Sequence, residues 1–233
     1  MPVSVTFQRD NAYDQLLDLI LAGRLPTDRP ISERQISSEL GIGRTPVREA
    51  MRALAQDGLL EIIPARGTFV RRISDDQLRE LFEVRQALEC QAAELAARRG
   101  ASEQLRAFKS KLEKSRSAQN DGEIAETYEI GADFHVEVCR SAGNQILFEL
   151  YMPIRIRFKA TIRLGRYYDP KWIIDGIDQH LGILSAIESG DAQRARRQMS
   201  DHLRCSYESK KRILQELGLP DAPARFVVHQ GAS

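Results

Sequence analysis

The stretch GIGRTPVREAMRALAQDGLL, residues 41–60, decides the fold of the first part of this chain. It predicts a tight turn, then a helix with arginines on its first turns, and then a glycine stop before an apolar strand. A helix N-terminus favours anions, and a planar guanidinium can bind a phosphate or the O6/N7 edge of guanine. The stretch is therefore typical of a helix that enters a groove of DNA.

The flanking residues predict elements that support this helix. Apolar positions at helical spacing indicate a helix between Tyr13 and Leu21, and a short helix follows from a Ser32 cap to Gly41. After Gly58, residues 59–63 and 68–72 are predicted strands joined by a turn. The expected order is three helices and then a hairpin.

Residues 12–72 resemble the winged helix-turn-helix of the GntR family of bacterial transcription regulators. The resemblance is carried by Gly23-Arg-Leu, Ser32-Glu-Arg, Leu40-Gly-Ile-Gly-Arg-Thr-Pro-Val-Arg-Glu-Ala, Leu54, Gly58-Leu and Pro64-Ala-Arg-Gly67. It implies that the DNA contacts are Arg34, Arg44, Thr45, Arg48, Arg66 and Gly67. Gly43 departs from the family, which usually has Ser or Thr there, and we expect a small loss of affinity.

Charge alone does not decide whether these arginines contact DNA or form a solvated helix face. Residues 1–73 hold ten Arg, no Lys and nine Asp plus Glu, which is not the strong basic excess of many DNA-binding domains. Their placement favours DNA contact, because Arg44, Arg48 and Arg52 lie four residues apart on the polar face of one helix.

The rest of the chain is predicted to be helical. Ser74-Asp-Asp-Gln forms a capping box, and five breaks separate six helices. The breaks lie at Ser102, between Ser117 and Ile124, and at Gly143-Asn144, Asp169-Pro170 and Gly190-Asp191. The predicted fold is mainly α. It has a winged helix-turn-helix in residues 1–73, an all-helical effector and dimerisation domain in residues 74–220, and a flexible tail in residues 221–233.

Three of the four histidines are predicted to point inward from three different helices. They are His135, His180 and His202. Each by itself is more typical of a hydrogen-bonded core histidine than of a metal ligand, and no His-x-x-x-His spacing occurs among them. Together they predict convergence on one point.

The surrounding motifs resemble the effector (FCD) domain of the FadR-type branch of the same family. They are Phe134-His135, Ala142-Gly-Asn144, Ala186-Ile-Glu-Ser-Gly-Asp191 and His202-Leu203. The resemblance implies a divalent metal on His135, His180 and His202, and a small organic acid bound at that metal. Three neutral imidazoles can hold zinc or nickel. The carboxylate ligand of that branch is missing, because Gly131 stands in its place and Asp133 faces away. A metal-free polar pocket lined by the histidines therefore stays open as the alternative.

Two groups of basic residues in the second part have different expected roles. Arg85 is a candidate second anchor for the effector carboxylate, beside the three histidines, and an internal salt bridge to Glu89 is its alternative. The basic run on the fourth helix of this part is predicted to be a solvated face. The run comprises Arg155, Arg157, Lys159, Arg163 and Arg166.

Composition limits the class of protein and its cellular compartment. The 233 residues, 42% of them hydrophobic, are ample for a core, and neither a signal peptide nor a membrane span is evident. We therefore expect a cytoplasmic protein with no membrane partner. Cys90, Cys139 and Cys205 are predicted to be reduced structural thiols.

The expected function is a regulator, not an enzyme. Two heads of a homodimer would bind an inverted-repeat operator in double-stranded DNA, most often as a repressor in this family. A small carboxylate effector would shift the heads through the linker at Ile73-Ser74. The alternatives are a metal-dependent enzyme acting on a small acid, which lacks a general base placed by any motif, and an architectural DNA-binding protein without an effector.

Overall fold

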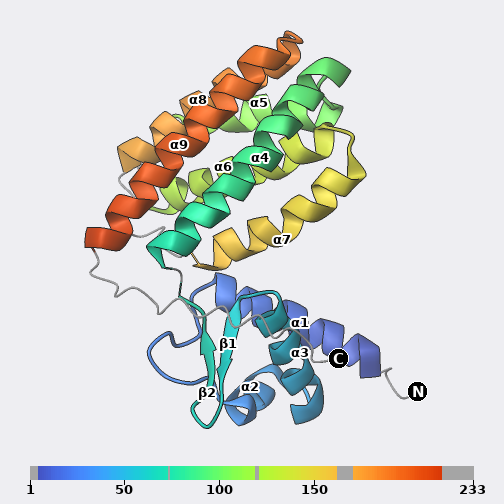
Figure 1. Ribbon diagram of the computed structural model, residues 1–233, viewed down its shortest axis with the longest axis vertical. Helices are drawn as coiled ribbons and strands as arrows, with labels where there is room; N and C mark the ends of the chain where they lie inside the picture. Colours follow the sequence, from blue (N-terminus) through green and yellow to red (C-terminus); the bar gives the residue numbers. More distant parts are fainter. Residues whose placement is uncertain (1–4, 73, 119–120, 162–169, 217–233) are drawn as a thin grey trace, which may run out of the picture.

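The computed structural model divides the chain into two bodies (Figure 1). It describes residues 5–72, 74–118, 121–161 and 170–216. Within these ranges, three helices and a hairpin form a winged head (residues 5–72), and six helices form a bundle (residues 74–216). The predicted mainly α fold class is confirmed. A domain boundary at Ile73 stays a prediction, because that residue lies outside the described ranges, as does the expected tail, residues 221–233.

Three helices form the base of the head. They are α1 (Val5–Leu21), α2 (Glu33–Leu40) and α3 (Arg44–Gln56). Ser32 caps α2 by accepting a hydrogen bond from the Gln35 amide, and Gly41 ends it at φ 65°, as predicted. The inward stripe of α3 packs against α1 in one apolar cluster, which includes Leu16, Ile20, Val47, Ala50, Met51 and Leu54.

The hairpin pairs β1 (Leu60–Ile63) with β2 (Gly67–Val70) in antiparallel register, with Leu60 opposite Val70. The Ile31 amide adds a bridge by donating to the Thr68 carbonyl at 2.7 Å, which ties the segment before α2 to the hairpin. At Gly67 the backbone has φ 111°, and an added Cβ would lie 2.9 Å from the Pro30 Cβ. Glycine is therefore required here for packing, independently of any contact with DNA.

The bundle is built from long helices with capped ends. Ser74 and Gln77 form the predicted capping box at the start of the first helix, with both hydrogen bonds 3.2 Å long. Ser102 caps the second by accepting from the Leu105 amide at 3.0 Å. The six helices are α4 (Asp75–Arg99), α5 (Glu103–Ser115), α6 (Asp121–Ser141), α7 (Gln145–Thr161), α8 (Pro170–Glu188) and α9 (Ala192–Glu216).

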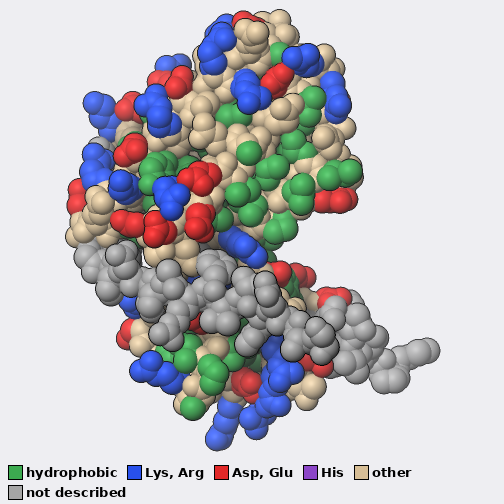
Figure 2. Space-filling view, in the orientation of Figure 1, with side chains coloured by type: hydrophobic (Ala, Val, Ile, Leu, Met, Phe, Trp, Pro, Cys, Tyr) green, Lys and Arg blue, Asp and Glu red, His purple; other side chains and the backbone are tan. Residues whose placement is uncertain are grey.

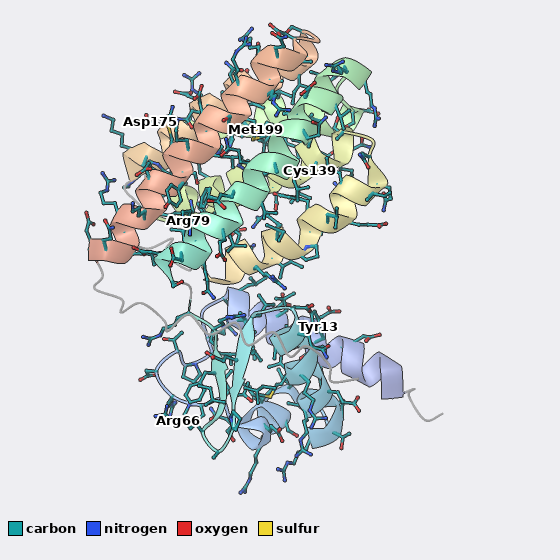
Figure 3. All side chains as sticks on the ribbon, viewed as in Figure 1. Tyr13, Arg66, Arg79, Cys139, Asp175 and Met199 are labelled. Carbon is teal, nitrogen blue, oxygen red and sulfur yellow. The ribbon has the colours of Figure 1, made fainter. Side chains whose placement is uncertain are left out.

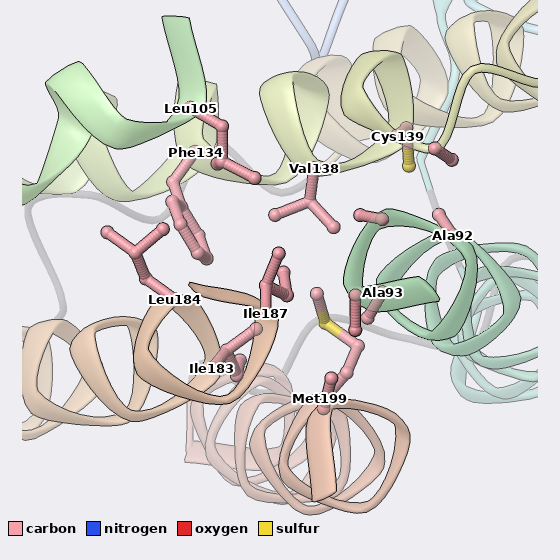
Figure 4. Close-up of a cluster of buried hydrophobic side chains, with 14 of the residues drawn as sticks. Ala92, Ala93, Leu105, Phe134, Val138, Cys139, Ile183, Leu184, Ile187 and Met199 are labelled. Carbon is pink, nitrogen blue, oxygen red and sulfur yellow. The ribbon is translucent and has the colours of Figure 1, made fainter. Parts of the chain in front are cut away.

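The core of the bundle lies where α4, α6, α8 and α9 meet (Figures 1 and 4). Helix α4 offers mainly small side chains here, Ala92, Ala93, Ala96 and Ala97, so that α9 can approach closely and Met199 fills the gap. Cys90 and Cys139 are buried free thiols, and Cys205 is a half-buried free thiol. In the described parts of the chain, no helix is both long and apolar enough to cross a membrane.

Candidate functional site

The outer face of α3 is the first candidate site. Its inner face is buried in the head, so Arg44, Arg48 and Arg52 are directed to solvent. Gly43 occupies the N-cap and gives no side-chain hydrogen bond, as expected from the missing hydroxyl. The first-turn amides of α3 therefore lack a side-chain cap, which leaves the helix N-terminus open to an anion.

All residues predicted to contact DNA are exposed, and they come from α2, α3 and the hairpin. Figure 2 shows basic side chains gathered at the end of the head that points away from the bundle, and Figure 3 places Arg66 at the hairpin tip. A contiguous arginine surface is what the phosphate backbone of a duplex requires. The exposed residues are Arg34, Arg44, Thr45, Arg48, Arg66 and Gly67.

Arg48 is held in a bidentate ion pair that the sequence did not suggest. Its Nε lies 3.0 Å and 3.1 Å from the two carboxylate oxygens of Glu33, and its Nη2 lies 2.9 Å from Oε2. Glu33 begins α2, so the pair joins the two helices of the helix-turn-helix. A phosphate or base that binds Arg48 must compete with this carboxylate, which lowers the net gain from that contact.

The second candidate site is the point where the three predicted histidines meet. Helices α6, α8 and α9 each contribute one, and their Nε2 atoms lie 3.1–3.2 Å from one another. All three side chains are buried. The predicted convergence of His135, His180 and His202 is present in the structure.

Two of these imidazoles are oriented by partners behind them. Glu89 Oε2 lies 2.5 Å from His135 Nδ1, and Gln179 Oε1 lies 2.7 Å from His202 Nδ1. Both partners are acceptors, so they assign the proton to Nδ1 and leave the Nε2 lone pairs directed at the meeting point. The Nδ1 of His180 has no hydrogen-bond partner among the described residues.

Burial controls the ionisation of this cluster. It lowers the pKa of His135, and it lowers the pKa values of His180 and His202 further, because neighbouring imidazoles disfavour a second charge. Burial alone raises the pKa of the Glu89 carboxyl, but the Arg85 charge and the hydrogen bonds from His135 and Arg85 outweigh burial and lower the pKa to about 2. The site thus presents neutral imidazoles supported by an ionised carboxylate, which is the form that binds a metal.

The geometry fits a divalent ion. Three nitrogens at about 2.0–2.1 Å from one ion lie about 3.3 Å apart in a tetrahedron and about 2.9 Å apart at right angles. The observed separations of 3.1–3.2 Å lie between these values. Without a cation, the unprotonated Nε2 atoms of His135 and His202 would face each other at 3.1 Å, which is unfavourable.

Gly131 leaves no room for a fourth protein ligand. A Cβ on this residue would lie 2.9 Å from His180 Cε1 and 3.3 Å from its Nδ1, so the His180 ring occupies the space that an aspartate would need. Asp133 is exposed, as predicted. Three histidines bring no negative charge to a divalent ion, so the site would keep its full positive charge for an anionic ligand.

A cavity opens beside the histidines, and two guanidiniums line it. The cavity has an empty volume of about 530 Å³, part of it open to solvent. Arg85 makes the alternative salt bridge to Glu89, with its Nε 2.6 Å from Oε1, yet it still lines the cavity. Its Nη1 has no hydrogen-bond partner among the described residues. The other lining guanidinium is Arg155.

The predicted solvated face on α7 is wrong for Arg155, which is only 8% exposed. Leu147, Tyr151, Arg155 and Phe158 are all buried and fall at helical spacing, so the apolar stripe contained the signal that Arg155 faces inward. Lys159 pairs with Glu129 at 2.6 Å, and Arg163 and Arg166 lie outside the described residues.

Lys210 on α9 is a second lining residue that sequence reasoning missed. It is 2% exposed and donates to Ser206 Oγ at 2.9 Å. Its ammonium also lies 4.7 Å from the centre of the Trp172 ring, within cation–π range. Its place on the inward stripe that includes His202 and Ser206 was the signal.

Comparisons with known proteins assign a family to each of the two parts of the chain. The family model "Bacterial regulatory proteins, gntR family" matches residues 8–70, and the model "FCD domain" matches residues 80–204. The HTH-type transcriptional repressor RspR of Escherichia coli (strain K12) is 32% identical over 193 residues, covering 80% of this chain and 82% of that protein. The "Probable D-xylose utilization operon transcriptional repressor" of Paenarthrobacter nicotinovorans is 31% identical, covering 84% and 87%.

A solved structure extends the likeness to the fold of most of the chain. The structure titled "E. coli McbR/YncC" superposes with a TM-score of 0.68 at 20% identity, covering 93% of this chain and 99% of that one. At this identity the likeness shows the fold alone.

Proposed function

The chain belongs to the GntR family of bacterial regulatory proteins and carries an FCD domain, so it is a transcription regulator, and we propose on that premise that it is a homodimeric repressor controlled by a small organic acid. The named relatives are repressors and not enzymes, which removes the metal-dependent enzyme from consideration. The proposed site of action is the cytoplasm, where the operator DNA lies.

The observation that carries the DNA-binding role is the exposed arginine surface of the head. Arg34, Arg44, Arg48 and Arg66 come from three elements and all face solvent. Arginine forks bind phosphates and guanine edges, and two such heads on one dimer would read two half-sites of an inverted repeat. Thr45 and Gly67 would add contacts at the helix start and the wing.

An uncovered apolar face on α7 supports a homodimer. Ile146 is 71% exposed and Leu150 is 59% exposed, and Val84 on the neighbouring α4 is 42% exposed. Figure 2 shows a continuous apolar patch on this side of the bundle. A helix that is apolar on both faces is normally buried on both, so we propose that a second copy of the chain covers it.

The pocket chemistry supports an anionic effector. Three neutral imidazoles would hold zinc or nickel, and the metal would supply a positive centre for a carboxylate. Arg85 and Arg155 would bind a carboxylate of the same acid, because both guanidiniums line the cavity. An architectural protein whose bundle only dimerises would not need these buried cations.

Operator titration tests the DNA-binding role. An operator is selected from random duplexes with the full chain, and its affinity is measured at one salt concentration. We expect Arg48→Ala to weaken specific binding roughly tenfold. Glu33→Gln should strengthen binding, because it releases the Arg48 guanidinium and removes a negative charge from the surface. Arg98→Ala, which removes an exposed arginine of the bundle, is the matched control. Unchanged binding in Arg48→Ala would refute the assignment of α3.

Metal content and ligand screening test the pocket. Elemental analysis of freshly purified protein should find zinc or nickel, and His180→Ala should lose it. A thermal-shift screen of lactate, succinate and citrate should raise the unfolding temperature of the wild type. A wild type without metal would favour the empty polar pocket, and no response to any acid would favour the architectural alternative.

A further inference from the structure

Helix α7 touches both the pocket and the head. It belongs to the bundle, yet its C-terminal end lies directly over the head in Figure 1. Ile156 packs against the apolar cluster of the head, while Phe158 belongs to a cluster of the bundle. Three consecutive residues, Arg155, Ile156 and Arg157, therefore contact the cavity, the head core and the end of α3 in turn.

Arg157 holds the C-terminal end of α3. Its Nε donates a hydrogen bond to the Asp57 carbonyl at 2.5 Å, and Asp57 is the C-cap of α3. A guanidinium at this end also interacts favourably with the helix dipole. Asp57 is fixed from a second side, because Tyr13 of α1 donates to its Oδ2 at 2.6 Å. Moving Arg157 therefore moves the end of the helix that is expected to read DNA.

The same turn of α7 is exposed to whatever occupies the cavity. Arg155 and Phe158 both line the cavity, and the Phe158 ring centre lies 4.0 Å from the Arg85 guanidinium carbon. Arg155 makes no hydrogen bond or ion pair within the described part of the chain, so its guanidinium is available to an anion. Pro153, inside the helix two residues before Arg155, removes a backbone hydrogen bond and gives α7 a place to bend.

We propose that α7 is the element that carries the effector signal: Arg155 binds the acid, and Arg157, two residues on, transmits the shift of α7 to the C-terminus of α3. The inference rests on the proposed function, since it requires an acid in the cavity and an operator on the head. Helix α7 would then connect the head and the bundle through packed side chains, in addition to the covalent linker at residues 73–74. Acid in the cavity and operator DNA on the head would then both shift the position of α7. A shared element of this kind is the physical requirement for coupling between two binding sites.

The test compares how strongly the acid changes operator affinity in the wild type and in two variants. Operator affinity is measured with and without citrate or succinate for the wild type, Arg157→Gln and Lys159→Gln. Lys159→Gln is the matched control, because it removes one charge from the same helix while its ion pair, to Glu129, lies within the bundle. Calorimetry without DNA gives the affinity of each chain for the acid.

The expected result is loss of coupling without loss of either binding event. The acid should change the wild-type operator affinity by about 5- to 150-fold, and the change should persist in Lys159→Gln. In Arg157→Gln it should fall below about twofold, while acid binding is retained. Arg155→Gln should bind the acid more weakly. Hydrogen exchange at Gly58 and Leu59 should become faster in Arg157→Gln.

Two outcomes would overturn the inference. Wild-type coupling in Arg157→Gln, or coupling lost equally in the Lys159→Gln control, would show that α7 does not transmit the signal through Arg157. If the wild type binds no acid at all, the proposed function fails first and the inference fails with it. Acid binding combined with coupling that survives in Arg157→Gln refutes only the inference.

Discussion

Replacing Glu89 by glutamine is a sharp test of the buried network behind the histidines. The carboxylate is fully buried and accepts from Arg85 Nε at 2.6 Å while it lies 2.5 Å from His135 Nδ1. An amide keeps the shape but removes the charge, which leaves the buried Arg85 guanidinium without a counterion. Breaking a buried pair in this way costs about 3–5 kcal/mol.

That cost gives a measurable shift in thermal unfolding. For a chain of this size, 1 kcal/mol corresponds to about 2–4 °C, so Glu89→Gln should lower the unfolding temperature by about 6–20 °C. The lost support of His135 should also weaken metal binding about 10- to 100-fold. Both are measured on the same preparation, by scanning calorimetry and by competition with a metal-binding dye.

Glu83→Gln is the control for this substitution. It lies on the same helix, and its carboxylate, 62% exposed, pairs with Arg79 in solvent. We expect it to leave the unfolding temperature and the metal affinity unchanged. An unfolding temperature of Glu89→Gln equal to that of Glu83→Gln would refute the reasoning, because Arg85 would then not depend on the buried carboxylate.

Three other predictions follow from single contacts. Gly43→Ser should stabilise the head by a few tenths of a kcal/mol in denaturant unfolding, because the new Cβ meets Pro46 at an ordinary 3.6 Å and the hydroxyl supplies the missing cap; a loss of stability would contradict this. Leu150→Glu should convert the dimer to monomer in sedimentation analysis, and a dimer that persists would place the interface elsewhere. At pH 8, iodoacetamide should modify Cys205 first by mass spectrometry, since burial raises the pKa of the Cys90 thiol to about 11; first modification at Cys90 would be inconsistent with this burial.

Much of the fold was predictable from the sequence because the capping and turn residues mark the same elements as the spacing of the buried apolar residues. The cap at Ser74, the left-handed Gly41 and the 3.6-residue stripe of α3 all specify local backbone geometry, and all are found as expected. Helix α1 begins at Val5, well before the predicted Tyr13, because that prediction followed only the apolar positions. Strand ends differ by one or two residues, which is the usual uncertainty of element boundaries.

Site residues were predictable from the sequence only where they lie on the inward-facing stripe of a helix. Three histidines on three inward stripes were enough to predict their convergence, although no sequence spacing links them. The Arg48–Glu33 pair was not predictable, because it depends on how α2 crosses α3. The basic run predicted a solvated Arg155, but its position on the apolar stripe of α7 places it inside. The close approach of the His180 ring to Gly131, which leaves no room for a Cβ, required coordinates, since it joins residues of two helices.

The central claim is that the histidine pocket controls the arginine surface, and a single operator titration tests it most directly. Operator affinity is measured for the zinc-loaded wild type and for His180→Ala, each with and without the acid that gives the largest thermal shift among lactate, succinate and citrate. We predict that the acid changes the wild-type affinity by about 5- to 150-fold and leaves the affinity of His180→Ala unchanged. Equal wild-type affinities with and without the acid would contradict the claim.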